Sequence, residues 1–437
     1  VTTTSSISMS EAQAIELTSI LQPADRRFTG KSSAAKRPTA YLVDSTIPPT
    51  LVPLTASRER SILRDLGKGL GTAKAPFVQD RLNLNNMMQK GVFGTIDAVK
   101  ELLGGDSDDA LNDVNNGGTD TGGTNKLKKP PASFVFFGMD WDSQVDAMLA
   151  HDLIKDIVSK RLSSSSSSTA IGLEFIPLSA QPLLDSYLQQ SLSEEELTNQ
   201  LVTNHFVDAL TLSLQMPLFR WVNRQQNQSS STSITLLALA PESADVRSVR
   251  LNGLQNLDPS AREKYVVDAN GFINLTQDSK FKLYVDRSLF KDYTPLETSS
   301  DKVDGPGDFF AERILVHEAV ATTLAKYAAA KGRAGCLVLT LAPTKDLRYM
   351  GGPNGRLPRV YNYLIGDNNN NNLALDDNAI TTILLNPTAQ QTLSQSKFLR
   401  LEIGTAPKNL VYQTKISDYL WFSSIPKVSL LPRLMNP

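Results

Sequence analysis

Continuous apolar runs alternate with segments of helical periodicity between residues 133 and 342. The run "SFVFFG" (133–138) is typical of a parallel strand that is covered on both faces. The segment after it repeats apolar residues every three to four positions, which predicts an amphipathic helix. Further apolar runs occupy 170–176, 233–240 and 335–342, with helical patterns between them. This order predicts an α/β fold with a mainly parallel central sheet flanked by helices.

Local signals mark the starts of several helices. Ser193 followed three residues later by Glu196 is a capping-box pattern. Asp258 precedes Pro259, which predicts an N-cap with proline at the first helical position. The helices expected from caps and periodicity begin at these two sites or cover 57–67, 85–103, 179–190, 242–251 and 314–331, and a first core helix carries the stripe Val145, Met148, Leu149, Leu153 and Ile157.

Composition divides the chain into four parts. Residues 1–103 are expected to form a partly helical N-terminal extension, and 104–130 a low-complexity linker rich in Gly, Asp and Asn. The α/β core is assigned to 131–366. Residues 367–437 begin with an asparagine-rich loop and continue with short β-branched and aromatic runs, which predicts a strand-rich part of the same domain.

Charge and residue usage exclude several classes of protein. A formal net charge of -1 provides no global field for nucleic acid, so no nucleic-acid partner is expected. No apolar run approaches the roughly 18–20 residues that cross a bilayer. A single cysteine excludes an internal disulfide, and the three histidines show no metal-binding spacing. The hydroxyl-rich start "TTTSSISMS" fits the end of an organelle transit peptide, which predicts import after removal of a leader.

Three quoted stretches carry a resemblance to a known family. They are "FVFFGMDWD" (134–142), "AIGLEFIPLSAQPLLDSYL" (170–188) and "LLALAPESADVRSVRLNGLQNLDPSAREKY" (236–265). Together they resemble the ChaN-like family of haem-binding proteins in the Tiki superfamily, and most closely its plant and algal plastid members. The resemblance implies the ChaN-like α/β fold, haem or a related tetrapyrrole as the cofactor, and a chloroplast location in the stroma or at the thylakoid.

Two departures from the family pattern bear on activity. Family members typically continue the first strand into Gly-Glu-x-His and a late strand into Gly-x-x-His. The corresponding residues are Gly-Met-Asp-Trp at 138–141 and Pro-Thr-Lys-Asp at 343–346. A catalytic metal needs about three imidazole or carboxylate ligands around one point, and methionine, tryptophan and proline do not supply them. We therefore expect a non-enzymatic member of the family.

An alternative site uses the carboxylates that remain. Asp140, Glu174 and Asp346 follow or end apolar runs, so they are expected near the carboxyl ends of parallel strands, where α/β sheets bind ligands. If these side chains cluster, they could hold a metal ion for a Tiki-type hydrolase, with His317 as the base.

The family resemblance also suggests residues for haem. Imidazole and phenolate are both axial ligands of haem iron, arginine pairs with propionates, and an aromatic ring at a strand end suits stacking on a planar ligand. For each residue, ordinary packing or solvation is the competing interpretation. The candidates are His317, Tyr349, Arg348, Arg356 and Trp141, with Arg359, Tyr361 and Tyr363 close by in sequence.

Two segments are candidates for protein contacts. Residues 417–428 carry three aromatic side chains between turn residues, and they are expected either as a core strand or, where exposed, as a contact anchor. The extension 1–103 has little counterpart in the family. The plastid resemblance implies a structural or assembly role on a thylakoid membrane complex through one of these segments.

Overall fold

The structure is a computed structural model of the chain. It describes residues 40–44, 50–67, 134–162, 168–228, 234–269, 271, 305–331, 336–366, 375, 379–388 and 416–423.

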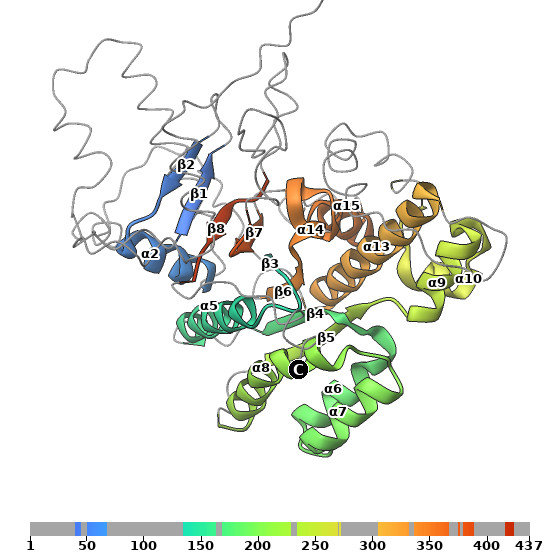
Figure 1. The fold of residues 1–437 in the computed structure, drawn as a ribbon, viewed down its shortest axis with the longest axis horizontal. Coiled ribbons are helices and arrows are strands. Elements are labelled where there is room, and N and C mark those ends of the chain that lie inside the picture. The colour runs from blue at the N-terminus through green and yellow to red at the C-terminus, as the bar shows by residue number, and fades with distance from the viewer. Residues whose placement is uncertain are drawn as a thin grey trace, which may run out of the picture.

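The described residues form one eight-stranded sheet with the order β2-β1-β8-β7-β3-β6-β4-β5 (Figure 1). From β8 to β5 all neighbouring strands are parallel, whereas β1 pairs antiparallel with both β2 and β8. The mainly parallel α/β fold predicted from the sequence is therefore confirmed. The strands are β1 Ala40–Asp44, β2 Thr50–Pro53, β3 Phe134–Met139, β4 Thr169–Pro177, β5 Ile234–Ala240, β6 Leu337–Pro343, β7 Ile380–Leu385 and β8 Tyr419–Trp421.

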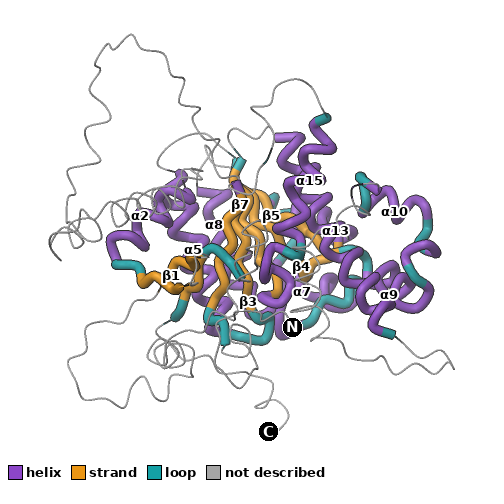
Figure 2. Tube along the Cα trace, turned by 90° about the horizontal axis from the view of Figure 1, so that it is seen from above, coloured by secondary structure: helices purple, strands orange, loops and turns teal. Residues whose placement is uncertain are grey.

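Helices cover both faces of the sheet, as Figures 1 and 2 show. Because side chains alternate along a strand, Val135 and Phe137 of β3 enter one core cluster and Phe134 and Phe136 enter the other. The first cluster packs against α5 Gln144–Leu162, α6 Gln181–Leu188, α7 Glu194–Thr203 and α8 Ala209–Gln228. The second packs against α13 Pro306–Lys331 and α15 Pro353–Ile365.

The capping signals are confirmed. Ser193 and Glu196 form both bonds of a capping box at the start of α7, and the Asp258 side chain accepts from the Ser260 backbone N–H at the start of α10 Pro259–Tyr265. The expected helix around 242–251 is α9 Ser243–Asn252. In α5 the stripe is buried except at Met148, whose side chain is 47% exposed, and at the partly buried Leu149.

Two of the longer described helices, α8 and α15, were missed by the sequence analysis. The helix α8 was missed because Pro217 lies inside it and its many polar residues weaken the apolar periodicity of a helix. The segment "MGGPNGRLPR" was interpreted as a glycine-rich turn, but α15 begins inside it, with Pro353 in its first turn. The glycines remain necessary there, because a Cβ on Gly355 would lie 1.6 Å from the Met350 carbonyl oxygen.

Parts of both terminal regions complete the sheet. β1, from the predicted extension, bonds to β8, and the helix α2 Ala56–Gly67 contacts α5 through the bond from Arg161 Nη1 to the Gly67 carbonyl (3.3 Å). Trp421 and Phe422 are buried, so the described part of 417–428 forms a core strand. The predicted helix 85–103 and the linker 104–130 lie outside the described residues. Among the described helices, none combines the length and apolar character required to span a bilayer.

Candidate functional site

The strand ends of the central sheet meet at one edge, as the sequence predicts. Gly138 pairs with Ala342, and Leu173 with Leu341, so β3, β6 and β4 end at nearly the same level. Glu174 is the next residue of β4, and Thr344 begins the short helix α14 Thr344–Leu347 directly after β6. Polar side chains from separate strands are therefore brought together at this edge.

Asp346 is the centre of a buried polar cluster on the α13 face. Its carboxylate is ion-paired with Arg313 and lies 3.2 Å from His317 Nε2, and both partners come from α13. Burial alone would raise the pKa of Asp346, but Arg313 and His317 outweigh burial and hold that pKa well below its usual range. Asp346 is therefore an ionised carboxylate that is already neutralised inside the protein.

His317 is completely buried beside Asp346. Burial lowers the pKa of its imidazole to about 4, and the nearby cations Arg313 and Arg356 act in the same direction while Asp346 opposes them. The ring is therefore neutral at neutral pH. Since none of its surface reaches solvent, the structure gives a haem macrocycle no access to His317.

Glu174 faces the same cluster from β4. Burial raises the pKa of its carboxyl group to about 8, the charge of Asp346 adds to this rise, and Arg313 and Lys345 partly offset it. The group is therefore protonated at neutral pH. Its Oε2 atom is buried and makes no hydrogen bond within the described chain.

The proposed three-carboxylate metal site is not assembled. Among the described residues, no group of three or more His, Cys, Asp or Glu side chains is arranged to hold a metal ion. Asp346 is occupied by Arg313, and a protonated Glu174 is a poor ligand. The alternative set of Asp140, Glu174 and Asp346 therefore lacks the geometry that a hydrolytic metal centre requires.

Most of the arginine and tyrosine candidates for haem lie in the interior, whereas Arg359 is half-buried and Tyr363 is 57% exposed. Arg356 is 1% exposed and donates from Nη1 to Glu318 of α13 at 3.0 Å, while Tyr349 is 2% and Arg348 6% exposed. Arg359, which was also considered, bonds to Asp268 and Glu318. These side chains connect helices to one another, and packing explains their positions better than propionate binding.

Trp141 is the one half-buried member of the predicted haem set. Its ring packs edge-on against Phe175 of β4, with centroids 5.1 Å apart and planes at 61°. Both rings lie on the face of the sheet opposite Glu174, against the α5 and α8 core. The pair leaves partly accessible aromatic surface at the strand ends.

Several polar anchors of this edge were missed. Asp146 of α5 is fully buried and accepts from the Asp140 backbone N–H (3.0 Å) and from Asn386 Nδ2 (2.9 Å). Asn386 in turn accepts from the Ser423 N–H at 2.7 Å. The contacts join residues up to 240 positions apart, so spacing along the chain gave no signal for them.

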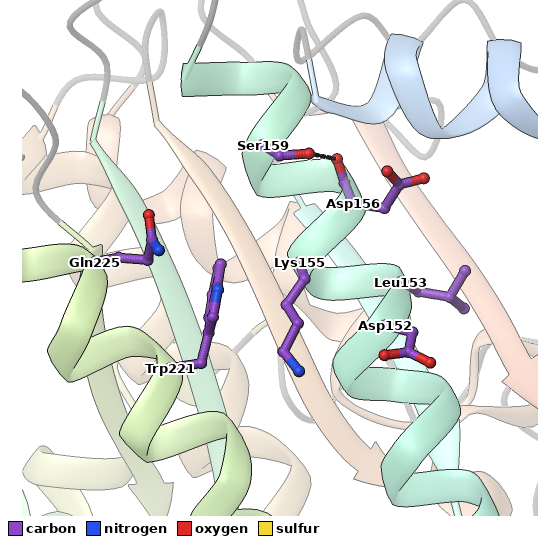
Figure 3. Close-up of a pocket in the computed structure, with 7 residues that line it drawn as sticks. All are labelled: Asp152, Leu153, Lys155, Asp156, Ser159, Trp221 and Gln225. Atoms are coloured by element: carbon purple, nitrogen blue, oxygen red, sulfur yellow. Dashed lines mark hydrogen bonds between the residues drawn. The ribbon is translucent and has the colours of Figure 1, made fainter. Parts of the chain in front are cut away.

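A groove of about 530 Å³ lies elsewhere, between α5 and α8 (Figure 3). Trp221 and Lys155 face each other across it, and Asp152 and Asp156 flank the lysine on α5. Asp152, Lys155 and Asp156 belong to the second half of α5, which runs back toward the amino ends of the strands. The groove is thus remote from the strand edge where α/β sheets usually bind ligands.

The chain is similar to one protein family and to several solved structures. Residues 127–342 match the family model described as haem-binding uptake, Tiki superfamily, ChaN. Among solved structures, the Campylobacter jejuni ChaN structure described as showing cofacial haem binding is 16% identical, with a TM-score of 0.37 over 68% of this chain and 88% of that one. A Bacillus cereus protein is 12% identical, with a TM-score of 0.30 over 59% of this chain and 66% of its own. No curated protein matches the sequence. On this match, residues 127–342 of the chain belong to the ChaN family of the Tiki superfamily.

Proposed function

We propose that this protein binds haem or a related tetrapyrrole and does not transform it. The observation that carries the proposal is the match of residues 127–342 to a family model defined by haem binding. A flat macrocycle can be held against the surface at the sheet edge, so the proposal requires no large buried cavity.

A binding role without catalysis is supported by the polar cluster. A hydrolytic metal site needs ligands that converge on an open position. Here Asp346 is neutralised by Arg313, and His317 is completely buried on α13. The charges satisfy one another, and nothing in the cluster is directed at an incoming substrate.

The accessible aromatic surface fits the proposed ligand. Trp141 and Phe175 present partly exposed rings at the strand ends, and such rings pack well on a porphyrin face. His317, Tyr349, Arg348 and Arg356 would not touch a ligand in this structure. Haem would therefore be held by side chains outside that buried set.

The proposed location is the chloroplast, at a thylakoid complex, as the resemblance to plastid members implies. The aromatic rings described within 417–428 are buried, so they do not support a contact through that segment. Gentle solubilisation of thylakoid membranes followed by native electrophoresis tests this part. Co-migration with a membrane complex is expected, and recovery of all the protein alone in the stromal fraction would contradict it.

Haemin titration of the purified 437-residue chain tests the binding proposal. We expect the Soret band to shift and to saturate at a fixed number of haems per chain. A parallel titration into detergent micelles provides the pattern of non-specific partitioning. If the protein sample follows that unsaturated pattern, the proposed function is wrong.

A further inference from the structure

Accessibility separates the three histidines of the chain. His317 is fully buried, and His151 is 4% exposed with its Nε2 atom 3.0 Å from Gln215 of α8. His205 is half-buried in the loop between α7 and α8, where it reaches solvent. All three histidines of the sequence are described, so His205 is the one imidazole that a surface ligand can contact.

His205 is held by a polar relay at the ends of β4 and β5. Pro177 pairs with Ala240 in the sheet, and Ser179 and Glu242 each follow two residues later. The Ser179 hydroxyl donates to Glu242 Oε2 at 2.7 Å, and its oxygen lies 3.0 Å from His205 Nδ1. We call His205, Ser179 and Glu242 the relay.

The carboxylate at the base of the relay is firmly fixed. Glu242 Oε1 accepts from the Ser179 backbone N–H at 2.9 Å and from Lys264 Nζ at 3.2 Å. The Glu242 backbone N–H donates to Tyr265 Oη at 3.1 Å. Partial burial tends to raise the pKa of Glu242, but the bonds from Ser179 and Lys264 outweigh it and leave that pKa below its usual value. Glu242 is therefore a charged acceptor.

The direction of these bonds decides the tautomer of His205. A serine hydroxyl carries one proton, and that proton is donated to Glu242. Ser179 Oγ must then accept from His205, so Nδ1 carries a hydrogen, and in the neutral form of the imidazole the lone pair is on Nε2. Within the described chain, no other hydrogen bond to His205 is formed. A carboxylate that orients an imidazole in this way is the usual support for a metal-ligating histidine.

The same geometry argues against a serine nucleophile. In a hydrolase the histidine must accept the serine proton, but here Glu242 takes it. The Ser179 N–H, which could have stabilised an oxyanion, is also bonded to Glu242. The relay is built to present an imidazole nitrogen and not an activated hydroxyl.

Phe206, the residue after His205 in the chain, supplies an exposed apolar surface. Its side chain is 80% exposed, and its backbone φ is 55°, a left-handed conformation that bulky residues rarely adopt. The bond from the Val207 N–H to the Leu201 carbonyl (3.0 Å) closes the turn that holds it. An exposed aromatic ring kept in a strained backbone position is the sort of feature found at ligand sites.

From the relay and Phe206 we infer that His205 Nε2 is the protein ligand of the haem iron, with Glu242 and Ser179 as positioning residues and Phe206 against the macrocycle. The inference rests on the proposed function and adds its ligand. The sequence suggests His317, on α13, as a candidate haem ligand. The inferred iron site lies instead at the loop that contains His205, beside the ends of β4 and β5.

The test compares spectra of the ferric complex in the full-length protein and its variants. The wild type should show the absorption and electron paramagnetic resonance signature of imidazole ligation. In His205→Ala that signature should disappear and the dissociation constant should rise about 10–100-fold, while free imidazole restores the signature. Glu242→Gln should weaken haem about 10-fold with the imidazole signature retained. The matched control is Tyr363→Phe, which changes the exposed tyrosine on α15 and should leave the spectrum unchanged.

The outcomes separate the two proposals. Unfolding temperature, measured without haem, should be the same for His205→Ala and wild type because the side chain is half-buried in a loop. If the wild type binds haem stoichiometrically and His205→Ala gives the same spectrum, the ligand inference is wrong and the proposed function stands. If Tyr363→Phe changes the spectrum instead, a tyrosine is the ligand. A wild type that binds no haem overturns both.

Discussion

The buried cluster around Asp346 and the relay around Glu242 contain similar side chains and differ in what surrounds them. Each joins a carboxylate, a histidine and a basic residue at the carboxyl end of a strand of the same sheet. In the first, burial forces every charge to find an internal partner. In the second, solvent access leaves one imidazole nitrogen open. Burial, more than residue type, decides whether such a group stabilises the fold or is available to a ligand.

Removal of the central charge of the buried cluster should have the largest effect. Asp346→Asn leaves Arg313 without its carboxylate partner at a buried position, and breaking a buried pair costs about 3–5 kcal/mol. Urea unfolding followed by circular dichroism measures the change in the free energy of unfolding. A cost below about 1 kcal/mol would show that water reaches the cluster and would remove the contrast between the two regions.

The tightly packed start of α15 should be nearly as sensitive. Gly355→Ala places a Cβ 1.6 Å from the Met350 carbonyl, so the first turn of α15 must shift. We expect a loss of about 2–3 kcal/mol in the free energy of unfolding, as for other overpacked sites. Gly307→Ala is the matched control, because no atom lies within 4 Å of the position that its new Cβ would occupy on α13. Equal stability of the two variants would contradict the close approach of Gly355 to the Met350 carbonyl.

The pH dependence of the free energy of unfolding tests whether Glu174 is protonated inside the buried cluster. Its pKa rises from 4.5 in the unfolded chain to about 8 when folded, so between these values the folded state binds more protons and stability falls as pH rises. Glu174→Gln mimics the protonated group, so it should be nearly neutral at pH ~4, below both pKa values, and increasingly stabilising as the pH rises, by several kcal/mol at pH ~9. Urea unfolding of the wild type and the variant at both pH values measures the difference in their free energies of unfolding. If the variant and the wild type respond to pH equally, Glu174 is ionised in the folded protein.

The sequence predicted those parts of the molecule that local chemistry determines. The apolar run at 134–139 and the Ser193 cap need only neighbouring residues, and both appear as expected. The strand edge also followed, because parallel strands end together. What could not be predicted was access to solvent. Nothing in the local sequence around His317 shows that it will be completely buried. Nothing around His205 shows that Ser179, 26 positions away, will bond to it, or that Glu242 will accept the proton of that serine.

The relay should tolerate substitution far better than the cluster. Glu242→Gln keeps an amide oxygen for the Ser179 N–H and removes a charge that is 27% exposed, so the expected loss is below about 1 kcal/mol. Measured by urea unfolding without haem, it should be the smallest change of the four variants. Without the charge on residue 242, the Ser179 hydroxyl is free to donate its proton to His205 instead. The imidazole then loses its fixed tautomer. A variant that is stable yet binds haem more weakly would therefore separate a ligand site from a structural one. A large loss of stability would instead mean that the relay, like the cluster, serves the fold.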